Sequence, residues 1–148
     1  MPHHAGTRCR YFPTREDLLW GIFAARGEAY GRNILERVER QETGYGRFAA
    51  YFDVLADIFR QLRKIFPRRS FGSRDTVRLL EEKFRDGTIR EDLPPHATCI
   101  SLVYSASGLA GALAKNAPFL PHKYATEAVT ALSLALDTML RGLRLEEK

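Results

Sequence analysis

The sequence predicts an all-α protein that folds as a single helical domain of five or six helices. Its apolar residues recur at helical spacing, and no stretch alternates apolar and polar residues for long enough to indicate a half-buried strand. An apolar content of 45% in 148 residues is enough for one core, whereas the chain is short for two domains. We find no repeat, low-complexity tract or linker that would divide it.

The first predicted helix begins at Thr14 and ends near Arg40. The Thr14 hydroxyl can accept a hydrogen bond from the free amide of Asp17, whose carboxylate also meets the positive end of the helix dipole. Gly44 and Gly46 then break the chain. The buried face of this helix comprises Leu19, Ile22, Phe23, Tyr30, Ile34 and Val38.

The second predicted helix has the clearest apolar pattern of the chain and ends before Pro67. Its pattern comprises Phe48, Tyr51, Phe52, Leu55, Ile58, Phe59, Leu62, Ile65 and Phe66. Ser73 can then cap a shorter third helix. We expect its buried residues to be Val77, Leu80 and Phe84, followed by a loop with the sequence DGTIREDLPP.

The fourth predicted helix begins at Pro94 and Pro95, whose missing amides cost nothing in a first turn, and ends near Asn116. Small residues fill its interior and would let another helix approach closely: Ser101, Ser105, Gly108, Ala110, Gly111 and Ala112.

The fifth predicted helix runs from about Pro121 to Leu143. It carries two apolar rows, so we expect it to be covered on more than one side. One row comprises Ala125, Ala128, Leu132, Ala135 and Met139, and the other comprises Val129, Leu136, Leu140 and Leu143.

The charge balance and cysteine content indicate a soluble, cytoplasmic protein. The formal net charge of +5 permits association with nucleic acid without demanding it. Cys9 and Cys99 have no metal-ligand spacing and are too few for a disulfide scaffold. The N-terminus has no apolar signal region, and we expect no segment that spans a membrane.

Three segments resemble the TetR family of transcriptional regulators. The stretch GTRCRYFPTREDLLW, from Gly6 to Trp20, is similar to the junction at which the recognition helix of the family's helix-turn-helix ends and the long fourth helix begins. The loop DGTIREDLPP resembles the loop before the family's eighth helix, and Leu136 to Leu143 resembles the end of its ninth. The junction matches at Gly6, Thr7, Tyr11, Phe12, Thr14, Arg15, Glu16, Leu18 and Leu19.

The resemblance implies that residues 1–13 are a remnant of a DNA-binding head and that residues 14–148 form an effector-binding and dimerisation domain. It also implies that Thr7, Tyr11 and Arg15 lie near the DNA backbone. The chain departs from the family pattern at Arg8 and Cys9. We expect the head to be mostly absent, because its scaffold would require roughly 35 to 40 further residues.

The resemblance also implies a pocket for a small apolar or amphipathic effector, although spacing alone makes an aromatic row a core by default. Tyr51 and Tyr104 are the best polar groups for such a pocket, because a buried phenol needs a partner. The predicted pocket residues are Tyr51, Phe52, Leu55, Phe59, Phe84 and Tyr104.

In the family, the last two helices of each subunit pair into a four-helix bundle, so we expect a homodimer. Tight crossing of the same helices within one subunit is the alternative reading. The predicted interface comprises Ser105, Gly108, Ala112, Val129, Leu132, Leu136 and Leu140.

No enzyme, metal or cofactor pattern accompanies these features. His3 and His4 lack further ligands nearby, and no serine or cysteine has a paired base. The basic clusters around Arg8 and Arg68 are more typical of solvated surfaces than of binding sites, and the junction motif favours a phosphate contact for Arg15 alone. The resemblance favours a ligand-responsive regulator, in which operator DNA is a partner if the head is present; the alternative is a headless dimeric module that binds a ligand or protein but not DNA.

Overall fold

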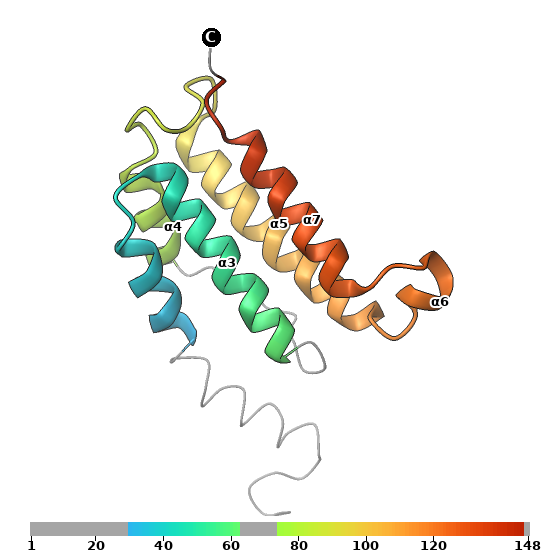
Figure 1. The fold of residues 1–148 in the computed structure, drawn as a ribbon. Helices are drawn as coiled ribbons and strands as arrows, with labels where there is room; N and C mark the ends of the chain where they lie inside the picture. The colour runs from blue at the N-terminus through green and yellow to red at the C-terminus, as the bar shows by residue number, and fades with distance from the viewer. Residues whose placement is uncertain (1–29, 63–73, 147–148) are drawn as a thin grey trace, which may run out of the picture.

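The structure is a computed structural model, and it describes residues 30–62 and 74–146. All of its regular structure in these ranges is helical, apart from one isolated antiparallel bridge between Ile89 and Arg144, which confirms the all-α prediction. The helices are residues 30–39, α3 (Gly44–Leu62), α4 (Arg74–Glu82), α5 (Pro95–Asn116), α6 (Leu120–Tyr124) and α7 (Ala128–Gly142). Figure 1 shows their order along the chain.

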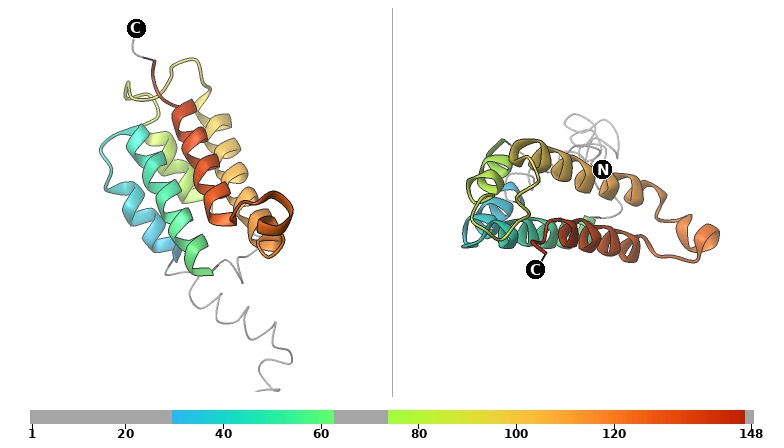
Figure 2. Two further views of the ribbon diagram at one scale, coloured as in Figure 1. Left: turned by 45° about the vertical axis from the view of Figure 1, so that its right-hand side comes forward. Right: turned by 90° about the horizontal axis from the view of Figure 1, so that it is seen from above.

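The long helices form two layers. Seen from above, α3 and α7 lie in one row and α5 lies across from them, with α4 beside the start of α5 (Figure 2). Helix α7 packs against both α3 and α5, and α4 also packs against both of them. Helix α6 stands apart at the end where α5 finishes and α7 begins (Figures 1 and 2).

The inner face of α3 supplies the centre of the core. Every apolar position predicted for this helix is buried, up to the last residue whose side chain the structure describes. These positions are Phe48, Tyr51, Phe52, Leu55, Ile58 and Phe59. Fully burying side chains of this size stabilises the fold by roughly 1.5–3 kcal/mol each, and α3 has more buried apolar residues than any other described helix.

Partners distant in sequence fix the first turn of α3. The amide of Gly44 donates to Asp86 Oδ2 at 2.7 Å, and the amide of Tyr45 donates to Thr88 Oγ1 at 3.0 Å. A Cβ at Gly44 would lie 2.2 Å from the carbonyl oxygen of Lys83, so only glycine fits this approach. The loop after α4 therefore caps α3, which satisfies amides that a helix leaves free.

Asp86 is held as a carboxylate by these contacts. Partial burial raises its pKa, but hydrogen bonds from the Thr88 hydroxyl and from the amides of Gly44 and Thr88, with the nearby Lys83 charge, outweigh that effect. The net result is a pKa below the ordinary value for Asp.

The buried arginine Arg47 joins three elements. Its Nη1 donates to the Leu79 carbonyl at 2.7 Å and to Glu82 Oε2 at 2.9 Å, and its Nε donates to the Gln41 carbonyl at 3.3 Å. A buried charge is tolerated because these oxygens replace its water. The contacts hold α3 to α4 and to the segment after residues 30–39.

Helix α4 buries a different face from the one predicted. Leu80 and Phe84 are buried as expected, but Thr76 and Leu79 are also buried whereas Val77 is only half-buried. The spacing of 76, 79 and 80 places these residues on one helical face, so the prediction for Val77 was wrong by about one position. Ser73, the predicted cap, lies outside the described residues.

The predicted bounds of the fourth helix are confirmed by α5, but the predicted fifth helix is wrong in extent, because it is two helices. Ala125 adopts a left-handed conformation (φ 53°) and its amide donates to the Pro121 carbonyl, which ends α6. Glu127 is extended and precedes α7. The two predicted rows also differ: Ala125 is exposed, and the buried residues Ala128, Leu132, Leu136 and Leu143 come from both rows.

Helix α5 is long and apolar enough to cross a membrane by length and composition alone, which leaves the expectation from the sequence untested. The same test is passed by core helices of soluble proteins. Just over a quarter (28%) of its most apolar window is fully buried in this fold, and Leu102, Leu109 and Leu113 are partly buried against the core.

Candidate functional site

The predicted DNA contacts Thr7, Tyr11 and Arg15 lie outside the described residues. The candidate sites within the described ranges are the aromatic cluster around Tyr51, the outer face of α5 and α7, and a groove between α3 and α7.

The aromatic cluster brings together five of the six predicted effector residues. Phe48 packs edge-on against Phe84, with ring centroids 6.1 Å apart, and Phe52 lies 6.3 Å from Phe48 and 5.7 Å from Tyr51. Tilted and edge-on contacts of this kind stabilise aromatic pairs beyond simple burial. Tyr51, Phe52, Leu55, Phe59 and Phe84 are all buried.

The hydroxyl of Tyr51 is the unusual atom of this cluster. It is buried and is the only such side-chain polar atom without a hydrogen-bond partner among the described residues. Burial raises the pKa of Tyr51 well above its ordinary value, so the phenol stays protonated and remains a donor. A buried donor without an acceptor costs about 1–3 kcal/mol, which a bound molecule with an acceptor oxygen would recover.

Tyr104, the sixth predicted effector residue, does not join the cluster. It lies on the outer face of α5 with 62% of its surface exposed. The predicted pairing of Tyr51 and Tyr104 as two polar groups of one pocket therefore has no support in the fold of the single subunit.

The outer face of α5 carries no charged residue between Ala97 and Ala112. It presents large apolar or aromatic groups at Ile100 and Tyr104 and small residues elsewhere. The predicted interface residues Ser105, Gly108 and Ala112 all lie on this exposed face. An outer helix face of a complete monomer is normally polar or charged.

The predicted interface residues of α7 are placed differently. Leu132 and Leu136 lie in the core of the chain, and Val129 and Leu140 are half-buried against it. Leu134, which the sequence did not single out, is 67% exposed. Because helical periodicity gives two similar apolar rows, it could not show which row faces the subunit's own core.

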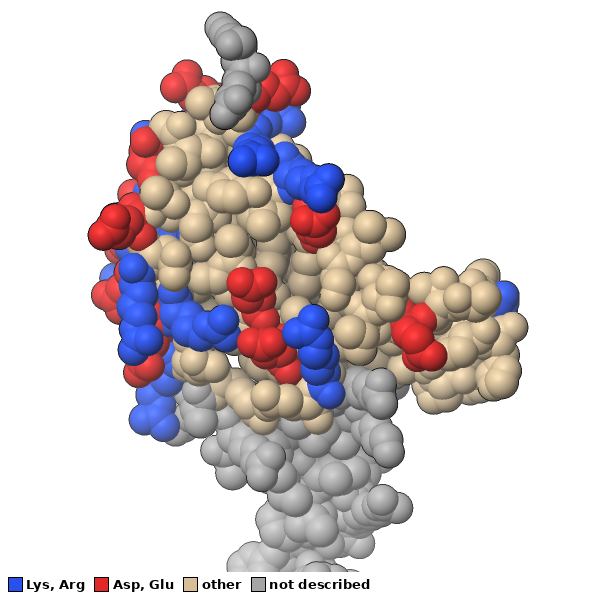
Figure 3. Space-filling model, in the orientation of Figure 1, with Lys and Arg blue, Asp and Glu red and all other residues tan. Residues whose placement is uncertain are grey.

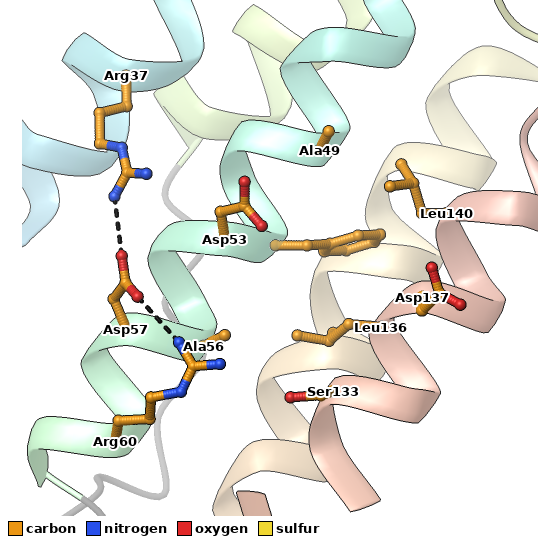
Figure 4. Close-up of a pocket in the computed structure, with 11 residues that line it drawn as sticks. Arg37, Ala49, Asp53, Ala56, Asp57, Arg60, Ser133, Leu136, Asp137 and Leu140 are labelled. Atoms are coloured by element: carbon orange, nitrogen blue, oxygen red, sulfur yellow. Dashed lines mark hydrogen bonds and ion pairs between the residues drawn. The ribbon is translucent and has the colours of Figure 1, made fainter. Parts of the chain in front are cut away.

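A groove of about 480 Å³ lies between α3 and α7 (Figure 4). On the α3 side, Asp57 accepts from Arg37 and from Arg60, each at 3.2 Å. Leu136 and Leu140 line the α7 side. The cations therefore have a carboxylate between them and are not free to attract an anion.

Charged groups at other places form pairs on the surface rather than a reactive site. On the exposed face of α4, Arg78 lies 3.7 Å from Asp75, and His96 at the start of α5 contacts Glu81 of α4. Burial, followed by the charge of Glu81, raises the pKa of Cys99 to about 12, so this thiol is inert at neutral pH. No group of three metal-ligating residues occurs within residues 30–62 and 74–146.

The charged side chains visible in Figure 3 lie mainly over the α3 side of the molecule, while the lobe that contains α6 is largely uncharged.

Comparisons with protein-family models, with curated proteins and with solved structures found no match.

Proposed function

We propose that this chain is the effector-binding and dimerisation body of a TetR-type transcriptional regulator, in which two copies associate through α5 and α7. The observation that carries the proposal is the uncharged, exposed outer face of α5, together with the exposed Leu134 of α7. Contiguous apolar surface of this kind marks an interface in a soluble protein. The junction motif from Gly6 to Trp20 supports the assignment to a regulator rather than to an unrelated dimer.

The proposed effector site is the cluster around Tyr51. Its unpartnered hydroxyl supports a ligand that brings a hydrogen-bond acceptor into an aromatic environment. Among the described residues the buried charged side chain is Arg47, and three oxygens already bind it. A neutral apolar molecule with one acceptor oxygen suits this site better than an ion.

Contacts between α3 and the preceding helix supply a route from the effector to the DNA-binding end. Arg37 on the helix of residues 30–39 pairs with Asp57 of α3, and Arg47 of α3 binds the Gln41 carbonyl just beyond that helix. An effector that displaces α3 would therefore also move this helix, which leads back along the chain to the junction motif. The switch requires that the effector bind the two arrangements with different affinities.

The dimer is tested with two exposed positions, Tyr104→Glu and Leu134→Glu, introduced together. Neither side chain is needed for the core, so the variant should fold as the wild type does but sediment as a monomer at concentrations where the wild type is a dimer. The combination Leu132→Glu and Leu136→Glu is unsuitable because both residues are buried in the subunit. A folded double variant that remains dimeric would remove the proposed interface.

A further inference from the structure

The connection between α5 and α7, residues 117–127, projects from the bundle, and we call it the arm. It contains the five-residue helix α6, in which no residue is buried. Figure 1 and the view from above in Figure 2 show α6 standing clear of the other helices. The arm therefore contributes no fully buried residue, although Ala117 and Leu120 pack partly against the core.

Two aromatic side chains of the arm are left in solvent. Phe119 is 65% exposed and Tyr124 is 62% exposed. Among the described residues, the ring contact of this pair is that of Tyr124 with Lys123, whose Nζ lies 5.3 Å from the centre of the ring. An aromatic side chain can bury 150–250 Å². Because both rings are exposed, they add little hydrophobic stabilisation to a single subunit.

The arm is continuous with the outer face of α5 and α7. It begins where α5, with its uncharged outer face, ends, and it finishes where α7 begins. Its first five residues, 117–121, are also uncharged. Figure 3 shows this lobe extending sideways from the body of the molecule. A partner bound on the outer face of α5 and α7 would lie next to the arm.

We propose that the arm docks on a second copy of this chain, so that each subunit of the dimer holds its partner with Phe119 and Tyr124. The inference rests on the proposed dimer and adds to it a second, projecting contact. Two-fold symmetry makes the contact reciprocal, so that four aromatic side chains are buried per dimer. The absence of charge on the facing surface of α5 means that no ionised group has to be desolvated there.

The test compares the full chain with the arm variant Phe119→Ser, Tyr124→Ser by sedimentation equilibrium. We expect the dissociation constant of the dimer to rise by roughly 100-fold, because aromatic anchors dominate interfaces of this kind. The matched control is Leu145→Ser, which replaces a half-exposed apolar residue beyond the opposite end of α7 and should leave the constant unchanged. Unchanged helical circular dichroism shows that each variant is folded.

A photoreactive p-benzoylphenylalanine in place of Phe119 gives a second readout that does not depend on stability. Irradiation should yield covalent dimers, and the yield should fall when Tyr104→Glu and Leu134→Glu are added. A dimer that the arm variant does not weaken, and that gives no covalent product, overturns the arm contact alone. A wild-type chain that stays monomeric overturns the proposed dimer itself, and binding to phosphatidylcholine vesicles that the arm variant abolishes would assign the arm to a lipid surface instead.

Discussion

Helices α3 and α5 are both rich in apolar residues, but the outer face of α3 carries charged residues and that of α5 does not. The outer face of α3 carries Asp53, Asp57 and Arg60, and its inner face supplies the buried aromatic cluster. Helix α5 buries small residues on its inner face and shows solvent an outer face without charge. The presence or absence of charge on the outer face of a helix, rather than the composition of its inner face, therefore indicates whether the helix is exposed to solvent or covered by a partner.

A tyrosine on each helix shows the same difference between the buried face of α3 and the exposed face of α5. Tyr51 of α3 is fully buried with an unpartnered hydroxyl, whereas Tyr104 of α5 is mostly exposed with its ring in water. The Tyr51 hydroxyl has no hydrogen-bond partner among the described residues, and the Tyr104 ring is left in solvent. We expect a ligand to bind the Tyr51 hydroxyl and a second subunit to cover the Tyr104 ring.

The largest expected effect is the loss of stability from a substitution in the core of α3, compared with a similar substitution in the arm. Phe48→Ala removes a ring that contacts both Phe52 and Phe84, and it should lower the free energy of unfolding by about 3–5 kcal/mol in urea titrations. Phe119→Ala, measured at concentrations where the chain is monomeric, should change it by less than about 0.5 kcal/mol. Equal losses in the two variants would show that the arm is packed within the subunit.

Two glycines test the close approach at α3 against the open face of α5. Gly44→Ala forces a Cβ against the Lys83 carbonyl and should destabilise the fold by about 1–3 kcal/mol. Gly108→Ala meets no atom within 4 Å and should stabilise the monomer by about 0.5–1 kcal/mol through better helix propensity. If thermal unfolding ranks the two variants in the reverse order, the packing at Gly44 is not as described.

Removing the Tyr51 hydroxyl should be neutral or favourable for the fold. Tyr51→Phe deletes a buried donor that has no acceptor, so the free energy of unfolding should stay the same or rise by about 1 kcal/mol. Tyr104→Phe, which alters an exposed hydroxyl, is the control and should have no effect. A clear loss of stability in Tyr51→Phe would mean that the hydroxyl already has a partner in the free protein.

The smallest expected effect is the pH dependence of the α3 cap. Because the folded-state pKa of Asp86 is lowered, its contribution is complete above the ordinary value near 3.8 and disappears as the pH falls below it. Asp86 is exposed, so solvent screening limits this contribution to less than about 1 kcal/mol. Acid unfolding curves of Asp86→Asn should therefore be shallower than those of the wild type, while identical curves would show that the cap adds nothing.

Much of the fold could be predicted from periodicity and helix-end signals. The bounds of α5 follow from Pro94 and Pro95 at its start, and the inner face of α3 follows from its unbroken spacing. The division of the last predicted helix could not be foreseen, because Ala125 takes a left-handed conformation without the glycine that usually marks one. Tertiary context overrides local preference at that residue.

The candidate sites were less predictable than the helices. The sequence identified the aromatic residues around Tyr51 but could not tell core from pocket, since both require the same side chains. On α7 it indicated Leu132 and Leu136 for the interface, whereas the exposed residue is Leu134. Which apolar row faces outward depends on the angle at which α7 packs on α3 and α5, and the sequence alone does not define that angle.

The most direct measurement is hydroxyl-radical footprinting of the wild-type chain over a dilution series, read at the two tyrosines. The account predicts that Tyr51 is protected at every concentration and that Tyr104 reacts in dilute solution but becomes protected as the concentration rises. If Tyr104 is equally reactive at every concentration, the outer face of α5 is not covered by a second copy, and the proposed dimer is wrong.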